Sequence, residues 1–313
     1  MRMKSILAAA ALAGVAALAA APALAQPAGT PVCANCHELA HKSTVLTAHG
    51  ARNDAAGTAC AACHTNIAEH VKDSKIKPTS PLTSKTATAA EKSAVCLTCH
   101  AGNRNMAFWQ QGMHRKNDVS CNDCHAIHQA VSASNPKMLR VQEFAGAIYT
   151  TTARQLAYKT CVACHRDTRG EILKPSHHPI VEGKVACHDC HDPHGALSPS
   201  MLKAESYQDL CISCHADKRG PWIHEHPPVM ENCATCHTPH GSAHNRLLAQ
   251  KPPALCGDCH PGGHTHGLYD GRGTLPGVNP SNIRFEGSGC VGCHRQIHGS
   301  NAPPSAFGQF FLR

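Results

Sequence analysis

Ten copies of one short motif constrain this chain more than any other feature of its sequence. All 20 cysteines fall into Cys-x-x-Cys pairs, and a histidine directly follows the second cysteine of every pair. Histidine makes up only 26 of the 313 residues, so ten independent coincidences have a probability on the order of 10⁻¹¹. The cysteine pairs are Cys33/Cys36, Cys60/Cys63, Cys96/Cys99, Cys121/Cys124, Cys161/Cys164, Cys187/Cys190, Cys211/Cys214, Cys233/Cys236, Cys256/Cys259 and Cys290/Cys293. The histidines that follow them are His37, His64, His100, His125, His165, His191, His215, His237, His260 and His294.

Three chemistries compete for these cysteines. A disulfide framework suits an exported chain, but it gives no reason for the histidines. Zinc sites use Cys-x-x-Cys half-sites in pairs, with second ligands that vary. Cys-x-x-Cys-His is the attachment sequence of c-type haem, in which the two thiols form thioethers and the histidine binds the iron as proximal ligand. We therefore predict ten covalently attached haems c, with these cysteines as the thioether sites and these histidines as the proximal ligands.

The spacing within the motif fits one turn of helix, because residues i, i+3 and i+4 share a helix face. Helix-forming residues precede several motifs, as in AAEKSAVCLTCH and SYQDLCISCH. Residues 72–95 are rich in Lys, Ser, Thr and Pro, which predicts a loop. We expect short helices, almost no β-sheet and much irregular chain.

The composition argues against a large core made of side chains. Aromatic residues make up only 4% of the chain, beside 24 glycines and 21 prolines. This excludes a coiled coil, a collagen and a compact α/β enzyme. The predicted fold is a multihaem cytochrome c whose core is a chain of ten haems. Residues 129–157 contain no cysteine, which suggests two pentahaem halves, 26–165 and 166–313.

Sixteen histidines lie outside the motifs, and many recur at the same place in a five-fold repeat. Each repeat unit holds a motif, a bridging histidine, a second motif and a further histidine. These positions supply one candidate distal ligand for every iron. If each iron has two histidines, no coordination position is open to a substrate, so we predict an electron carrier rather than an enzyme. The candidates are His49, His70, His114, His128, His177, His194, His226, His240, His264 and His298.

Some of these choices have close competitors. An alignment of HEHPPVMENC with HHPIVEGKVAC favours His177 over His178. Nothing in the sequence separates His264 from His266, and we take His264. Met113 is an alternative axial ligand to His114, which we prefer. Four histidines are expected to be solvated or packed rather than ligands, namely His41, His188, His224 and His244.

The first 25 residues have the pattern of a cleavable signal peptide. Arg2 and Lys4 precede an alanine-rich apolar run that ends at the A-x-A site of residues 23–25. An uncleaved anchor is the alternative, but the apolar run is short. Cleavage leaves one decahaem domain, residues 26–313, and lowers the formal charge from +8 to about +6. Because the basic residues form no dense run, nucleic acid is a poor candidate partner.

Three stretches that join the motifs resemble decahaem cytochromes of the MtrA/DmsE type. They are KPSHHPIVEGKVACHDCHDPHG at 174–195, CHADKRGPWIHEHPPVMENCATCHTPHGS at 214–242 and GCHRQIHGSN at 292–301. The resemblance implies an exported periplasmic protein held at the outer membrane inside a porin-like β-barrel partner. Such cytochromes carry electrons between periplasmic or inner-membrane cytochromes and the cell exterior. An outer-surface multihaem cytochrome is then a further expected partner, and extracellular metal reduction or Fe(II) oxidation the expected process.

Two other functions compete with such a conduit. A periplasmic shuttle that feeds a terminal reductase needs no barrel partner, so co-purification with a barrel protein distinguishes the two. A multihaem reductase of a small substrate needs one haem with an open position. A high-spin ferric band in the optical spectrum would indicate that third function.

Overall fold

The protein is an assembly of short helices joined by irregular chain. The computed structural model describes residues 32–45, 47–50, 58–129, 132–133, 135–141, 153–260, 290–292 and 294–303. The longest α-helix in these ranges has 12 residues, which confirms the prediction of short helices. The α-helices are α1 (Glu38–Val45), α2 (Thr58–Ala61), α3 (Ile67–Lys72), α4 (Ala89–His100), α5 (Met113–Lys116), α6 (Cys121–Cys124), α7 (Ala153–Cys161), α8 (Arg166–Glu171), α9 (Cys187–Cys190), α10 (Tyr207–Ile212), α11 (Pro227–Glu231) and α12 (Ala254–Gly257).

Sheet is almost absent from the described residues, as predicted. Strand β1 (Ser176–His177) pairs antiparallel with β2 (Gly241–Ser242), and His177 lies opposite Gly241. Between the α-helices lie single turns of 3₁₀-helix. They are η1 (Val32–Asn35), η3 (Pro81–Thr83), η4 (Arg104–Met106), η5 (Trp109–Gln111), η6 (Pro199–Met201), η7 (Ala216–Lys218), η8 (Cys233–Thr235), η9 (Asn245–Leu247) and η11 (Cys290–Gly292).

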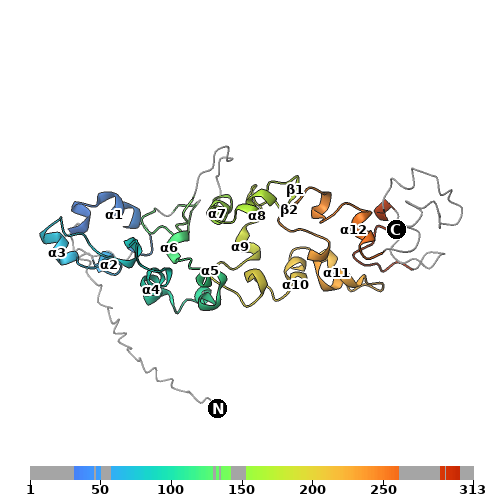
Figure 1. Ribbon diagram of the computed structural model, residues 1–313, viewed down its shortest axis with the longest axis horizontal. Coiled ribbons are helices and arrows are strands. Elements are labelled where there is room, and N and C mark those ends of the chain that lie inside the picture. Colours follow the sequence, from blue (N-terminus) through green and yellow to red (C-terminus); the bar gives the residue numbers. More distant parts are fainter. Residues whose placement is uncertain are drawn as a thin grey trace, which may run out of the picture.

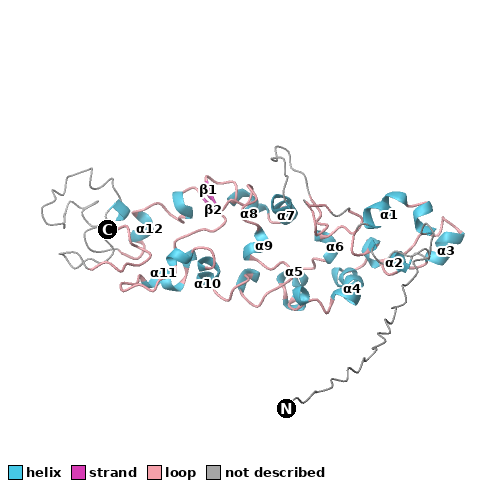
Figure 2. Ribbon diagram, turned by 180° about the vertical axis from the view of Figure 1, so that it is seen from behind, coloured by secondary structure: helices cyan, strands magenta, loops and turns pink. Residues whose placement is uncertain are grey.

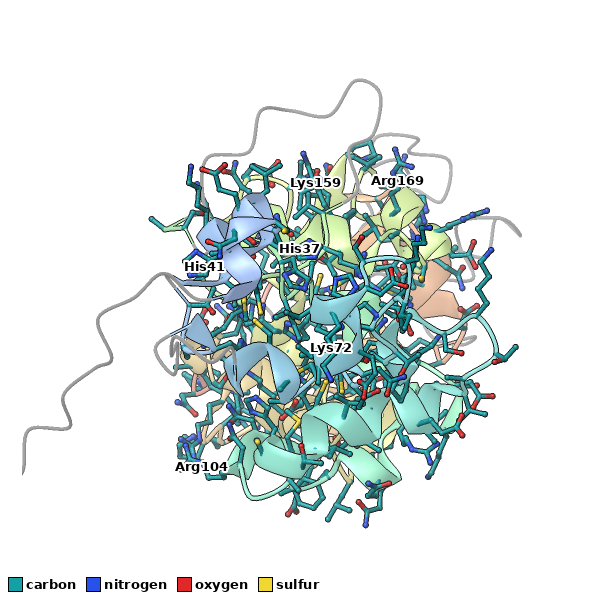
Figure 3. All side chains as sticks on the ribbon, turned by 90° about the vertical axis from the view of Figure 1, so that its left-hand side faces the viewer. His37, His41, Lys72, Arg104, Lys159 and Arg169 are labelled. Atoms are coloured by element: carbon teal, nitrogen blue, oxygen red, sulfur yellow. The ribbon has the colours of Figure 1, made fainter. Side chains whose placement is uncertain are left out.

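The elements follow one another along the long axis of an elongated molecule. In Figure 1, α1 to α3 lie at one end, α7 to α9 near the middle and α12 towards the other end. Figure 2 shows the same succession from behind. Figure 3 looks along the axis from the end that holds His37 and Lys72. Segments that are neighbours in the sequence are therefore neighbours along the molecule.

Helix α4 corrects one prediction. It contains the whole segment AAEKSAVCLTCH, so the loop expected over 72–95 is wrong from Ala89 onwards. The cause is a capping box, in which the Thr88 hydroxyl accepts from the Glu91 backbone N–H at 3.2 Å. The Glu91 carboxylate accepts in return from the Thr88 N–H at 2.7 Å. These reciprocal bonds satisfy donors that a helix start leaves free, and they outweigh the loop-like composition.

Buried apolar side chains are few among the described residues. One cluster joins α7, α8 and the chain before α9, and it consists of Tyr158, Val162, Ile172, Ile180 and Val181. Several large apolar side chains elsewhere are exposed, such as Leu39, Leu197 and Ile223. The protein's own side chains thus form only a small core, as the composition predicts.

Candidate haem sites

Each described motif forms one helical turn. The backbone N–H of the motif histidine donates to the carbonyl of the first cysteine at 2.8 Å in the first motif and 3.1 Å in the eighth. Helix α4 contains the third motif complete. Because this bond joins residues four apart, the two cysteines and the histidine lie on one face of the turn. The predicted helical turn is confirmed.

Nine of the ten motif histidines face a second histidine within the described residues. The ring centroids of each pair are 5.9–6.3 Å apart. The nine pairs are His37 with His70, His64 with His128, His100 with His49, His125 with His194, His165 with His114, His191 with His240, His215 with His178, His237 with His298 and His260 with His226.

The separation of the rings fits a metal between them. The angle between ring planes runs from 15° to 65° while the distance hardly changes. Packing between two aromatic rings permits separations of about 4.5–7 Å, so it gives no reason for the narrow range. Two imidazoles that bind one metal from opposite sides, each at about 2.0–2.1 Å, have centroids roughly 6 Å apart at any rotation about their shared axis. The residues therefore fit an iron held by two histidines.

The surroundings of these rings favour neutral imidazole, the form of the histidine side chain that binds metals. Burial lowers the pKa of His64, His165, His194, His226 and His298. A lowered pKa keeps the imidazole neutral at neutral pH, and only neutral imidazole has a nitrogen lone pair for a metal.

The partners come from different repeat units. The bridging histidine of one unit faces the first motif of the next, as His49 faces His100. The histidine after a second motif faces the second motif of the preceding unit, as His128 faces His64. The first motif is the exception, since His37 faces His70 within its own unit. Adjacent units therefore interlock.

His178, and not His177, faces a motif histidine, which is the opposite of the order favoured by the alignment. The His178 ring is 6.3 Å from that of His215. His177 instead contacts Glu182 at 3.2 Å, and its bond to the Lys174 carbonyl raises the pKa of His177. Consecutive side chains of an extended segment point to opposite sides, so only one of the two histidines can face His215.

Three further predictions concern individual histidines. His114 faces His165, which agrees with the preference over Met113. His264 and His266, the candidates for the tenth motif, lie outside the described residues, as does Cys293. The histidines expected not to be ligands belong to none of the nine pairs, namely His41, His188, His224 and His244.

Backbone carbonyls orient many of the paired rings. An Nδ1 that is bonded to a carbonyl leaves Nε2 for a metal and fixes the plane of the ring. Residue type alone does not identify these acceptors, because every residue carries a carbonyl. The bonds join His70 to Ile76, His114 to Pro193, His125 to Lys137, His178 to Pro239, His191 to Ser200 and His237 to Arg246, at 2.6–2.8 Å.

Three of these carbonyls belong to a loop that recurs after the second motif of a unit. The loops contain the segments KML, SML and RLL at 137–139, 200–202 and 246–248. Each includes residues with positive φ, such as Met138 and Arg246. The last leucine of each segment forms a backbone bridge with the motif histidine, as Leu202 does with His191. This recurrence is visible in the sequence and is a signal that the motif analysis missed.

Successive sites are also joined through their cysteines. The first cysteines of two successive motifs lie side by side, as Cys96 does with Cys121 and Cys161 with Cys187. The same contact joins Cys211 to Cys233 and Cys256 to Cys290. At the junctions between these pairs, the second cysteines lie near one another, namely Cys63 and Cys99, Cys124 and Cys164, Cys190 and Cys214, and Cys236 and Cys259.

These alternating contacts place the second to tenth motifs in sequence order along the molecule. Burial raises the pKa of Cys63, Cys124, Cys190 and Cys236. Such surroundings disfavour a charged thiolate and suit a neutral sulfur, as in a thioether.

Cys36 is a predicted thioether site, but it is not enclosed in the core. It is exposed, and it stands outside the series of contacts, which begins at the second motif. Cys36 follows the last residue of η1, and its N–H donates to the Cys33 carbonyl at 3.3 Å, a bond between residues three apart. Figure 1 shows that this first motif lies near one end of the molecule, before α1.

The same exposure recurs at every second motif. The exposed residues are the second cysteines of the odd-numbered motifs, namely Cys36, Cys99, Cys164, Cys214 and Cys259. No disulfide joins the cysteines of the described ranges. Exposure does not remove a thiol from the one-turn spacing that attachment requires, so Cys36 stays a predicted thioether site at the surface.

The described ranges contain neither a cluster of metal ligands nor a membrane-spanning helix. No group of three or more His, Cys, Asp or Glu side chains is arranged to hold a metal ion. No helix there is long and apolar enough to span a membrane.

The comparisons with known proteins agree with this geometry. Residues 60–145 match the family model described as cytochrome c-type protein NrfB-like. Residues 177–220 and 226–265 each match the doubled CXXCH motif. The chain is 34% identical over 284 residues to the multiheme cytochrome MtrA of Shewanella baltica (strain OS185), a match that covers 88% of this chain and 80% of the relative. Motifs, paired histidines and whole-chain similarity thus agree, and the chain belongs to the MtrA family of multihaem c-type cytochromes, which carry covalently bound haem c.

Proposed function

We propose that this protein carries ten haems c in one continuous row and conducts electrons along its length. Bound haem supplies one-electron redox chemistry. The chain's own part is to attach, orient and order the ten groups. The nine histidine pairs support this assignment for nine motifs. We assign His294 the tenth iron, with His264 or His266 opposite it.

The observation that carries the proposal is the order of the sites. From the second motif to the tenth, a cysteine of each motif lies near a cysteine of the next. The elongated shape keeps this order from one end towards the other (Figure 1). A protein that only stored haem would have no need of such a row.

Histidines on both sides of each iron leave no position for a substrate. The two imidazoles of a pair come from separate segments that backbone hydrogen bonds hold in place, as with His178 and the Pro239 carbonyl. The site therefore changes little between its oxidised and reduced states. This supports an electron carrier over a reductase.

The proposal includes a location and partners. Residues 1–25, which lie outside the described residues, direct export and are cleaved. The mature chain then lies in the periplasm, inside a porin-like β-barrel of the outer membrane. It exchanges electrons with periplasmic or inner-membrane cytochromes at one end and with an outer-surface multihaem cytochrome at the other. Extracellular metal reduction or Fe(II) oxidation is the process served. The similarity to a multiheme cytochrome MtrA supports this placement.

The first test is the state of the isolated protein. Mass spectrometry of the exported chain should show ten added haems and loss of residues 1–25. Its ferric spectrum should be entirely low-spin. Fewer than ten haems would contradict the count, and a high-spin band that responds to added ligand would favour a reductase.

The second test addresses the partner. The tagged protein, purified from detergent-solubilised outer membranes, should retain a barrel protein in fixed proportion. The complex in liposomes should reduce an acceptor enclosed in the vesicles when reductant is added outside. A monomer recovered without any membrane partner would refute the conduit and leave the periplasmic shuttle.

A further inference from the structure

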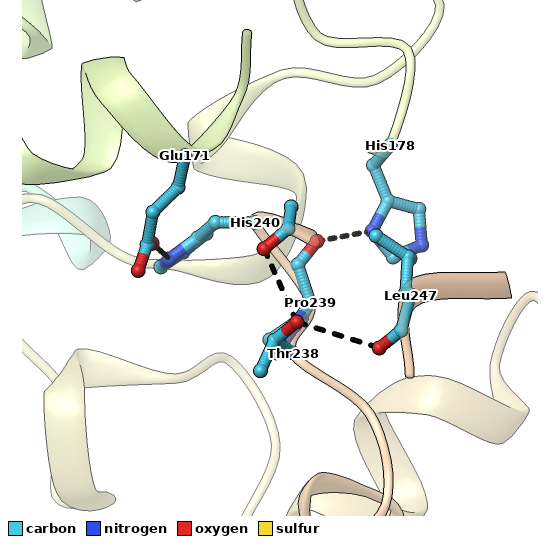
Figure 4. Close-up of polar contacts among 7 residues, drawn as sticks. Glu171, His178, Thr238, Pro239, His240 and Leu247 are labelled. Carbon is cyan, nitrogen blue, oxygen red and sulfur yellow. Dashed lines mark hydrogen bonds and ion pairs between the residues drawn. The ribbon is translucent and has the colours of Figure 1, made fainter. Parts of the chain in front are cut away.

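His240 differs from the six paired histidines whose Nδ1 is bonded to a backbone carbonyl, because its own Nδ1 faces a carboxylate. His240, which faces His191, has its Nδ1 3.1 Å from the Oε2 atom of Glu171 (Figure 4). The Nδ1 of His191 itself is bonded to the Ser200 carbonyl at 2.8 Å. The nearest parallel is His194, whose Nδ1 is 3.9 Å from Asp192, which is too long for a hydrogen bond.

The backbone holds Glu171 in this place. Glu171 ends α8, directly after the fifth motif. A Cβ atom added to Gly241 would collide with the Glu171 carbonyl, so glycine lets the segment that carries His240 lie against the end of α8. Pairing of β1 with β2 fixes the same segment from its other side. The backbones are therefore packed closely at this contact, although the side chains of His240 and Glu171 are 37% and 40% exposed.

We propose that Glu171 lowers the reduction potential of the sixth haem site, formed by His191 and His240. A carboxylate acceptor makes the imidazole a stronger donor to its metal than a neutral carbonyl does. The oxidised site has one more positive charge than the reduced site, so a nearby negative charge favours the oxidised form. Reduction of the site by one electron becomes less favourable. Glu171 is thus a positioning residue that acts through His240, and the inference rests on the proposed haem occupancy.

The charge of Glu171 matters for electron transfer between the sixth and seventh sites, in the middle of the row of haems. The segment 238–240 serves two sites, because the Pro239 carbonyl accepts from His178 of the seventh site and His240 belongs to the sixth (Figure 4). Glu171 changes the charge around only one of them. Glu171 therefore lowers the potential of the sixth site relative to the value that this site would have without the carboxylate, and it leaves the seventh site unchanged.

The test is Glu171→Gln in the full-length, haem-loaded protein. Glutamine keeps the size and an acceptor oxygen but removes the charge. In an optical redox titration, one of ten components should move to higher potential. The expected shift is about tenfold in the ferrous-to-ferric ratio at a fixed potential, or about 59 mV for one electron. Glu171→Asp, which keeps the charge but shortens the reach, should give a smaller shift in the same direction.

The matched control is Glu182→Gln. Glu182 also contacts a histidine, with its Oε1 3.2 Å from His177 Nε2, but His177 faces no motif histidine. This variant should leave all components in place. An unchanged titration of Glu171→Gln with full haem content, or an equal shift in Glu182→Gln, would overturn the inference.

Haem content and the low-spin spectrum of the unaltered protein separate this test from that of the proposed function. If the unaltered protein lacks ten low-spin haems, the proposed function fails. If it has them and electron paramagnetic resonance of Glu171→Gln shows every low-spin signal unmoved, only the role of Glu171 fails.

Discussion

The first histidine pair and the later ones have the same geometry but are built in opposite ways. His37 and His70 belong to one repeat unit, and the Nδ1 of His70 is bonded to Ile76, six residues away. His114 faces a motif of the next unit, and its Nδ1 is bonded to Pro193, 79 residues away. The first site is therefore local, whereas the later sites join units. Interlocking provides the cohesion that a small side-chain core cannot.

The histidine pairs also bear on the predicted division of the chain into two pentahaem halves. The boundary proposed between residues 165 and 166 separates His125 from His194, which face each other at 6.2 Å. His114 and His165, by contrast, both lie on its amino-terminal side. A cut at this boundary should leave the fourth site with one histidine, so the halves are not independent.

The first site and the later sites should differ most when haem attachment is removed. Cys33→Ala/Cys36→Ala should yield a folded protein with nine haems, because the first site closes within its own unit. Cys121→Ala/Cys124→Ala removes a site that links two units, and the amount of exported protein should fall several-fold. Haem staining and mass spectrometry of the periplasmic fraction measure both. Equal yields would contradict the distinction.

Loss of a distal histidine should have the next largest effect. His70→Ala and His194→Ala should each convert one haem to high-spin, visible by optical and electron paramagnetic resonance spectra. Only His194→Ala should also lower the thermal unfolding midpoint by several degrees, because it removes a link between units. Equal midpoints would mean that the cross-unit pairs do not hold the molecule together.

A smaller loss of stability is expected from a substitution at a position where two units pack closely. Gly241→Ala should destabilise the protein by about 1–3 kcal/mol, because the added methyl meets the Glu171 carbonyl. Gly170→Ala is the matched control one residue from Glu171, where a Cβ meets nothing within 4 Å. That variant should be neutral or stabilise by about 0.4–1 kcal/mol. Chemical denaturation followed by haem absorbance compares the two.

The smallest effect on haem ligation and on stability is expected from a substitution of His177. His177→Ala should leave every haem low-spin and change stability by no more than about 0.5 kcal/mol. His178→Ala should convert one haem to high-spin. If the two variants exchanged these results, the assignment of His178 to the seventh site would be wrong.

The sequence was sufficient to locate the motifs, because the attachment chemistry is confined to five consecutive residues. It also identified most partner histidines, since these recur at fixed places in the repeat. It favoured His177, whereas His178 faces His215 in the structure. The two residues are adjacent, and the choice depends on which way each side chain points beside strand β1. The sequence also left open which histidine faces which motif, because the pairing crosses units. Three of the acceptor carbonyls lie in the recurring segments KML, SML and RLL, but the other acceptors left no signal because every residue has a carbonyl.

The crossed pairing also determines the order in which the sites are completed as the chain emerges from its amino end. His49, His114, His178 and His226 precede the motif histidines that they face. Those sites have both imidazoles as soon as their own motif appears. His64, His125, His191 and His237 must instead wait for a histidine of the following unit. Biogenesis therefore alternates between sites that close at once and sites that wait for later chain.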